Sequence, residues 1–385
     1  MAICRTGMFD KNYIETLENQ IFREGIERAE AGAKVVGVYC AFTPKELIAA
    51  AGAIPVSLCA GSNQPIETAE KHLPRNLCPL IKASYGHALL DNCPYFHQTD
   101  LLLADATCDG KKKMFELLSN IKPIHVLMLP QTADGKESLM YWTAELGKVK
   151  NILEDLTRQV ITDETIEKQI SLYNRMKKAT NHVYVLNTGD IPLVYGREIN
   201  AVTGFRGFDC NLENRVAEIY QAIAVLKERK NDAEFVRTVR DKPRILLTGC
   251  PPTHKKILNM IEDSKAIVVA MENCGGLKTC RDFIPENQAN PLKALAEKYL
   301  HTACPCMTPN PRRLEIIGNL IREFRIDGVV ELIWDACHTY NVESYFIAEY
   351  VSQKCVKPYL KIGTDYSEND SEQVRTRIEA FLEML

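Results

Sequence analysis

Short apolar stretches alternate with longer amphipathic ones along most of this chain of 385 residues. The short stretches are rich in Val, Ile and Leu, as buried strands are, and the longer ones have apolar residues at spacings of three and four, as helices do. This alternation is typical of α/β domains built on parallel sheets. We therefore predict eight strands, at 34–39, 54–58, 101–104, 124–129, 244–249, 267–271, 328–334 and 358–362.

The predicted strands fall into two groups, separated by about a hundred residues of mainly helical pattern. We predict two doubly wound, flavodoxin- or Rossmann-like domains with a helical segment between them. The expected ranges are 1–135 for the N-terminal α/β domain, 136–240 for the helical segment and 241–385 for the C-terminal α/β domain.

Charge and hydropathy exclude several classes of partner. The formal net charge is −3, with 47 basic and 50 acidic residues, which gives no electrostatic reason to expect nucleic acid. No apolar run approaches the roughly 20 residues that a membrane span needs. The N-terminal residues lack the basic-then-apolar layout of a signal peptide. We expect a cytoplasmic protein without membrane or nucleic-acid partners.

Fourteen cysteines are unusual for such a protein, because a reducing compartment disfavours stable disulfides. We assign five of them to the carboxyl ends of predicted strands, as in "ELIWDACHTY". Open α/β sheets bind ligands at the carboxyl ends of their strands. We therefore interpret these five as a functional thiol cluster, although each alone could be a buried small apolar residue. They are Cys40, Cys108, Cys250, Cys274 and Cys337.

Loops between the strands add further thiols. Cys78 precedes a proline, and "CPC" places Cys304 and Cys306 two residues apart. Structural zinc sites are compact and typically use C-x-x-C pairs, which this chain lacks. Iron–sulfur clusters use thiolates almost exclusively and can take them from distant loops. The residues therefore favour an iron–sulfur cluster over zinc.

Two other kinds of chemistry are disfavoured. The chain has neither G-x-G-x-x-G after a strand nor G-x-x-x-x-G-K-[ST], so we do not expect it to hydrolyse ATP itself. Cys337 and His338 could form a nucleophile and base, but sequence neighbours at a strand end usually point in different directions.

Several segments resemble the 2-hydroxyacyl-CoA dehydratase family, which includes benzoyl-CoA reductase subunits. These segments are "GVYCAFTPKELIAAAGAIPVSL", "CPLIKASYG", "TCDGKKKMFE", "CPCMTPNPRR" and "GVVELIWDACHTYNVES". The phrases "LPRNLCPLIKASYG", "CDGKKKM", "MENCGG", "DACHTYNVES" and "IGTDYSEND" are most similar to the double-cubane-cluster branch. The resemblance implies a homodimer whose subunits each carry two cubane iron–sulfur units joined by a bridging sulfide. It also implies an ATP-hydrolysing iron–sulfur activator as the donor of single electrons for small-molecule reduction.

The resemblance also assigns residues. Cys78, Cys108 and Cys337 match the positions that hold a single cubane in ordinary dehydratase subunits. Our candidates for the second cubane are Cys40, Cys274 and Cys304. The reserves are Cys250 and Cys306. We interpret the remaining cysteines as structural, namely Cys4, Cys59, Cys93, Cys210, Cys280 and Cys355.

Other polar residues remain open. His338 is our catalytic candidate, as a hydrogen-bond donor to cluster sulfur or a proton relay, although it could equally be a satisfied histidine at the edge of the core. Four cations, Lys82, Lys111, Arg312 and Arg313, could offset cluster charge or dock the activator, but we expect them at the solvated surface by default.

Three functions are compatible with these residues. The first is a low-potential reductase that acts at a double-cubane cluster. The second is the iron–sulfur subunit of a 2-hydroxyacyl-CoA dehydratase, a lyase with a single cubane. The third is a non-catalytic electron carrier.

Overall fold

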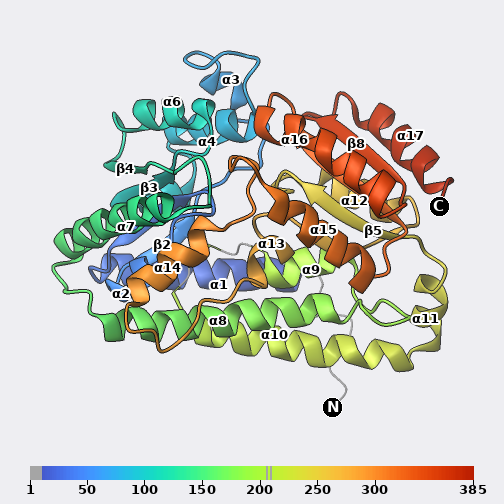
Figure 1. Ribbon diagram of the computed structural model, residues 1–385, viewed down its shortest axis with the longest axis horizontal. Helices are drawn as coiled ribbons and strands as arrows, with labels where there is room; N and C mark the ends of the chain where they lie inside the picture. The colour runs from blue at the N-terminus through green and yellow to red at the C-terminus, as the bar shows by residue number, and fades with distance from the viewer. Residues whose placement is uncertain (1–10, 205–206, 209) are drawn as a thin grey trace.

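The computed structural model describes residues 11–204, 207–208 and 210–385 (Figure 1). Cys4 and the first residues of the N-terminal segment lie outside this part of the chain. Two four-stranded, all-parallel sheets lie side by side, so the predicted α/β class with two parallel sheets is confirmed.

The first sheet has the strand order β2-β1-β3-β4. Its strands are β1 (Val35–Tyr39), β2 (Ile54–Ser57), β3 (Leu101–Asp105) and β4 (Ile124–Leu127). The helices within this sequence range are α2 (Lys45–Ala50), α3 (Ile66–Ala69), α4 (Pro79–Leu90), α5 (Pro94–His97) and α6 (Asp109–Leu118). We call this sheet with its flanking helices the first lobe.

The second sheet repeats that order as β6-β5-β7-β8. Its strands are β5 (Arg244–Gly249), β6 (Ile267–Glu272), β7 (Gly328–Trp334) and β8 (Tyr359–Thr364). The helices within this range are α12 (Lys256–Asp263), α13 (Leu277–Cys280), α14 (Pro291–Leu300), α15 (Pro311–Glu323), α16 (His338–Glu349), η3 (Tyr350–Lys354) and α17 (Ser371–Leu382). This sheet and the helices packed on it form the second lobe. The shared strand order answers a question that the sequence left open, because the two halves have the same topology.

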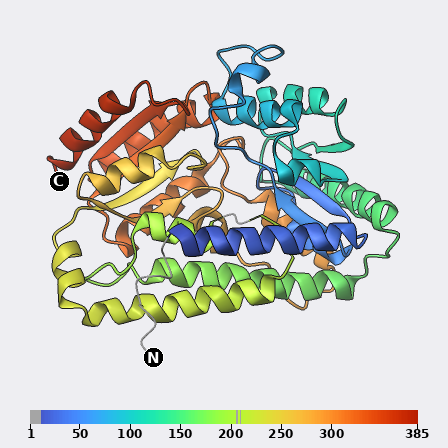
Figure 2. The same ribbon diagram turned by 180° about the vertical axis from the view of Figure 1, so that it is seen from behind.

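A layer of helices lies along one side of both sheets (Figures 1 and 2). Helix α8 packs lengthwise against α10, and α1 runs roughly parallel to both. Apart from the N-terminal α1 (Lys11–Glu30), the helices between the two sheets in sequence are α7 (Lys136–Thr157), α8 (Asp163–Val185), α9 (Gly196–Thr203), α10 (Leu212–Lys227), η2 (Glu228–Asn231) and α11 (Ala233–Val239). The predicted helical segment 136–240 corresponds to the run from α7 to α11.

One crossover was not anticipated from the sequence. Helix α14 comes from the C-terminal range, yet it packs against α7 and α8 on the first lobe (Figure 1). Leu295 and Leu300 are fully buried in the same core cluster as Val36 and Leu47. The loop after α14 therefore carries Cys304 and Cys306 back towards the first sheet.

The central strands of both sheets are buried on both faces, as is usual for parallel sheets, whereas the edge strands β4 and β8 are partly exposed. Every residue of β1, β3, β5, β6 and β7 is buried, which explains their nearly continuous apolar sequences. No helix in the described ranges is long and apolar enough to cross a membrane.

Candidate functional site: a pocket lined by thiols

The strand order determines where the thiols meet. In the order 2-1-3-4 the second strand lies on one side of the first and the third strand lies on the other side. This reversal of the strand order between strands 1 and 3 opens a crevice beyond their carboxyl ends. In the first lobe Cys40 follows β1 and Cys108 follows β3, and these strands are neighbours. In the second lobe Cys250 follows β5 and Cys337 follows β7, which are also neighbours. Each sheet thus presents two thiols at its switch point.

Both switch points open into one cavity of about 750 Å³. Residues from α1, α8 and α10 also line it, so the helical layer forms one of its walls. The cysteines that line the cavity are Cys40, Cys59, Cys78, Cys108, Cys210, Cys250, Cys274, Cys304, Cys306 and Cys337. We call this cavity the thiol pocket.

Three of these cysteines occupy helix N-cap positions. Cys78, Cys108 and Cys337 are the N-cap residues of α4, α6 and α16, although none of their side chains makes a capping hydrogen bond. The backbone N–H groups in the first turn of each helix still favour the anionic form of the thiol. We call these residues, together with Cys250, the helix-cap group.

Hydrogen bonds couple the helix-cap group. Bonds from the thiols of Cys250 and Cys78 lower the pKa of Cys337 to about 3. The bond to Cys337, followed by burial, raises the pKa of Cys78 well above its usual value. The Trp334 N–H donates to Cys250 Sγ at 3.4 Å. Cys78, Cys250 and Cys337 thus form one electrostatically coupled set.

A second set of thiols, Cys40, Cys274, Cys304 and Cys306, interact electrostatically. We call them the loop group. A hydrogen bond with Cys306 lowers the pKa of Cys304, and the same bond raises the pKa of Cys306. Which of the two thiols would be the metal ligand stays a prediction, because the two are coupled and share one proton.

Lys111 connects the two groups. It is 8 % exposed and lies in the first turn of α6. Burial opposes its charge, but the thiols of Cys40, Cys59 and Cys108 hold the pKa of Lys111 well above its usual value. Our expectation of a solvated Lys111 is therefore wrong, because this ammonium is buried among sulfur atoms.

Cys40 has a strained backbone. Its φ is 85°, a value that non-glycine residues rarely adopt. Such conformations persist only where the surrounding structure enforces them, and they cluster at functional sites. The strain is an independent reason to regard Cys40 as functional rather than as a filler of the core.

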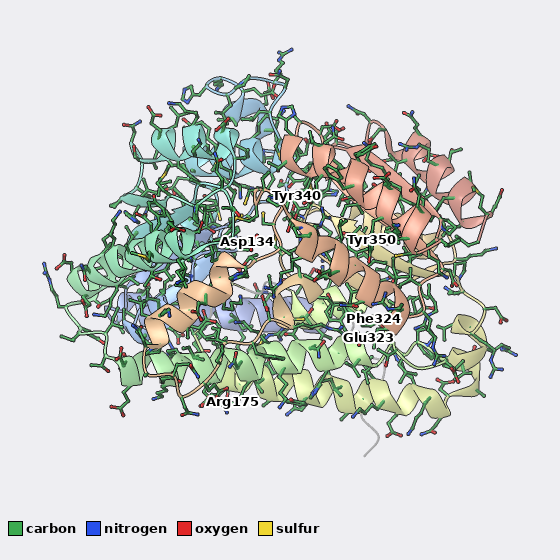
Figure 3. All side chains as sticks on the ribbon, in the orientation of Figure 1. Asp134, Arg175, Glu323, Phe324, Tyr340 and Tyr350 are labelled. Carbon is green, nitrogen blue, oxygen red and sulfur yellow. The ribbon has the colours of Figure 1, made fainter. Side chains whose placement is uncertain are left out.

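The second lobe places a buried charged network behind the loop group. Lys278 Nζ donates to the Tyr340 hydroxyl at 3.0 Å, and that oxygen lies 4.0 Å from Cys274 Sγ. Lys278 also pairs with Glu272 at 3.0 Å, and Arg313 is fully buried beside Glu272. Tyr340 lies between the two lobes, at the first turn of α16 (Figure 3).

The other three cations that we expected at the solvated surface have different environments. Arg313 is fully buried, so that expectation is wrong for it as well. Lys82 is 9 % exposed and pairs with Glu70 at 2.8 Å, so it is also buried. Arg312 is partly exposed and pairs with Asp282 at 2.7 Å.

All six predicted cluster ligands line the thiol pocket, and so do the reserves Cys250 and Cys306. His338 lines it too, as an exposed first residue of α16. Their roles as ligands or proton relay stay predictions.

Cys59 and Cys210, which we interpreted as structural, also line the pocket. Cys59 directly follows β2, so the strand-end rule would have found it. Lys298 and Tyr340 were missed altogether, because no sequence signal marked them.

The donor set fits an iron–sulfur cluster better than a single ion. Among the described residues, no group of three His, Cys, Asp or Glu side chains is arranged to hold one metal ion. The thirteen described cysteines are all free thiols, and those of the pocket come from both lobes around a cavity. A soft, polynuclear cluster uses such a dispersed, all-sulfur set. Three helix N-termini and Lys111 would compensate its negative charge.

Comparison with known proteins gives a consistent result. Residues 40–385 match the family described as "2-hydroxyglutaryl-CoA dehydratase, D-component". The chain is 40 % identical over 358 residues to the "Putative dehydratase subunit YjiM" of Escherichia coli, covering 92 % of each chain. It is 25 % identical to the (R)-phenyllactyl-CoA dehydratase beta subunit of Clostridium sporogenes, over 92 % of this chain and 93 % of the relative. It is 22 % identical to a benzoyl-CoA reductase subunit of Thauera aromatica, over 92 % of this chain and 91 % of the relative.

Proposed function

The chain belongs to the 2-hydroxyglutaryl-CoA dehydratase D-component family, a family of enzyme subunits, and we propose that it is a low-potential reductase that acts on small molecules at a double-cubane iron–sulfur cluster. The observation that carries this proposal is the number and grouping of the pocket thiols. Ten cysteines line one cavity, and eight of them fall into a helix-cap group and a loop group. One cubane would leave one of these groups without a function.

Each group supplies one half of the ligand set. In this proposal Cys78, Cys108 and Cys337 hold one cubane, and Cys40, Cys274 and Cys304 hold the other. When bound, the cluster would supply single electrons at low potential. Lys111, which contacts thiols of both groups, would stabilise the added negative charge. His338, which lines the pocket and is exposed, would exchange protons with solvent in this proposal.

The proposal includes partners. We infer that the functional unit is a homodimer and that a separate ATP-hydrolysing iron–sulfur activator donates the electrons, because this chain lacks a nucleotide-binding loop motif. The site is a pocket rather than a sealed core, which suits a small-molecule substrate.

A second candidate is the iron–sulfur subunit of a 2-hydroxyacyl-CoA dehydratase, which eliminates water through a radical. The names of the relatives favour it, since one is a phenyllactyl-CoA dehydratase subunit and another a putative dehydratase subunit. This function needs one cubane and a second, non-identical subunit.

Iron and acid-labile sulfide per chain, measured on protein purified without oxygen, separate the two candidates. We expect about eight irons, twice the four of one cubane. About four irons would favour the dehydratase subunit. Zinc alone, or colourless protein without iron, would exclude both.

A further inference from the structure

One buried lysine of the thiol pocket has no ion-pair partner within the part of the chain that the structure describes. Lys298, in the last turn of α14, is 8 % exposed and lines the pocket. No hydrogen bond or ion pair of this ammonium is found among the described residues. Its contact is with the ring of Tyr299, whose centroid lies 3.8 Å from Nζ.

The charged groups around Lys298 are already paired with one another. Glu46 of α2 pairs with Lys177 of α8 at 3.0 Å and accepts a hydrogen bond from the Tyr299 hydroxyl at 2.6 Å. Asp282, after α13, pairs with Arg312 of α15 at 2.7 Å. Lys298 thus faces two cations and two carboxylates whose charges are already compensated.

Such a position is costly for an ammonium. Burial, with the neighbouring Lys177 as the next cause, lowers the pKa of Lys298 to about 7. The other pocket lysine with a strong shift, Lys111, is held in its charged form by thiols. Lys298 is therefore a pocket ammonium that can release a proton near neutral pH, which is what a general acid requires.

We propose that Lys298 is the proton donor to substrates reduced in the thiol pocket. This inference rests on the proposed reductase function. The substrate class is a small molecule with a polar bond whose one-electron reduction leaves negative charge on oxygen or nitrogen. The electron comes from the low-potential donor, an Nζ–H bond of Lys298 breaks, and an N–H or O–H bond forms on the reduced atom. The resulting neutral amine regains a proton from water.

The test uses the full iron-loaded protein with titanium(III) citrate as electron donor and hydroxylamine as the probe, and the ammonia that titanium(III) forms without protein is subtracted from every rate. Reduction consumes two electrons and two protons and yields ammonia and water. We expect Lys298→Met to lower the rate of ammonia formation by about 100-fold or more, the usual contribution of a general acid. Lys298→Arg should be similarly slow, because a guanidinium stays protonated. In the wild type the rate should fall as pH rises through about 7, and both variants should lose this dependence.

Two further measurements separate a chemical role from a structural one. Lys293→Met, on the exposed side of the same helix, should keep the wild-type rate. Iron content should be unchanged in all three variants. If Lys298→Met keeps its iron, the wild-type rate and the wild-type pH profile, Lys298 is not the proton donor, but the reductase proposal is unaffected. If the wild-type protein itself contains no iron, both the reductase proposal and this inference are wrong.

A titration that does not depend on iron completes the test. In the apoprotein, ¹³C-dimethylation of the lysines should give one NMR resonance that titrates near pH 7 and is missing in Lys298→Met. If every lysine resonance titrates near pH 10, the inference is wrong whatever the rates show.

Discussion

In the first lobe the buried Lys111 beside the strand ends faces thiols, whereas in the second lobe the buried Arg313 faces carboxylates. Lys111 interacts with Cys40, Cys59 and Cys108. Arg313, by contrast, lies between Glu272, at 3.3 Å, and Glu331, at 3.0 Å. The two sheets have the same strand order, so topology does not account for this difference.

The comparison separates two roles within one fold. The charges of the second lobe are satisfied internally, which fits a rigid support for Tyr340 and Cys274. The first lobe leaves its cation, and the strained Cys40, directed at the pocket. We infer that the first lobe adjusts the electrostatics of the site while the second lobe holds its geometry.

The largest expected effect tests whether thiols of both lobes share one centre. Cys337→Ala should lose most of its iron and sulfide, because it removes a proposed ligand whose thiol is coupled to those of Cys78 and Cys250. Cys355→Ala is the matched control, since Cys355 lies outside the pocket, and it should keep the wild-type iron content. Equal iron in the two variants would contradict the assignment of ligands.

The second prediction concerns the internal network of the second lobe. Arg313→Met should lower the free energy of unfolding by about 3–5 kcal/mol, because it leaves buried carboxylates without a partner. Arg325→Met removes an exposed ion pair with Asp190 and should change the free energy of unfolding by no more than about 0.5 kcal/mol. Denaturant unfolding of both variants measures the difference. Similar values would show that the network does not support the lobe.

The third prediction uses the opposite pKa shifts of two buried carboxyl groups. Burial raises the pKa of Asp105 in the first lobe to about 6, from 3.8. The folded protein therefore binds this proton more tightly than the unfolded chain does. As a result, the free energy of unfolding falls by about 3 kcal/mol as pH rises from about 4 to about 6. Asp105→Asn should abolish this contribution, as seen by comparing denaturant unfolding at about pH 4.5 and pH 6.5.

Glu272 in the second lobe provides the contrast. Burial opposes its charge, but Lys278 and Arg313 hold its pKa below the usual 4.5. Its contribution to stability is therefore present above the unfolded pKa and is lost as pH falls through the lower folded value. Glu272→Gln should therefore lower the free energy of unfolding above about pH 5. The same pH dependence in both variants would contradict the electrostatic difference between the lobes.

The smallest expected effect tests whether the backbone of Cys40 in the first lobe is strained. At φ 85° glycine fits without a penalty, so Cys40→Gly should be more stable than Cys40→Ala by about 1 kcal/mol. Cys280, at the end of α13, should show the reverse order, because glycine weakens helices. Differential scanning calorimetry of the four apoproteins gives the comparison. A more stable alanine variant at position 40 would mean that its backbone is not strained.

Much of the fold follows from local patterns. The predicted strands at 244–249 and 328–334 match β5 and β7 to the residue, because each is a buried apolar run next to clear turn signals. Strand-end cysteines such as Cys108 and Cys337 could be identified as pocket residues because the carboxyl ends of parallel strands lie at one edge of a sheet.

Other parts of the site have no local signal. Lys298 and Arg313 look like ordinary helix cations in the sequence, and only packing buries them. Cys59 also follows a strand, but the sequence did not distinguish it from core cysteines. Its electrostatic interaction with Lys111 joins residues about fifty positions apart, so no local pattern marks it. The return of α14 to the first lobe also depends on packing between distant segments.

The sequence by itself determined two parallel sheets and a set of cysteines at their strand ends, because both depend on residues that are neighbours along the chain. Tertiary structure decided which thiols are coupled, which cations are buried and which of them has no ion-pair partner among the described residues. Those properties depend on burial and on distances between groups far apart in sequence, and the desolvation of a charge is set only when the two lobes and the helical layer close around it.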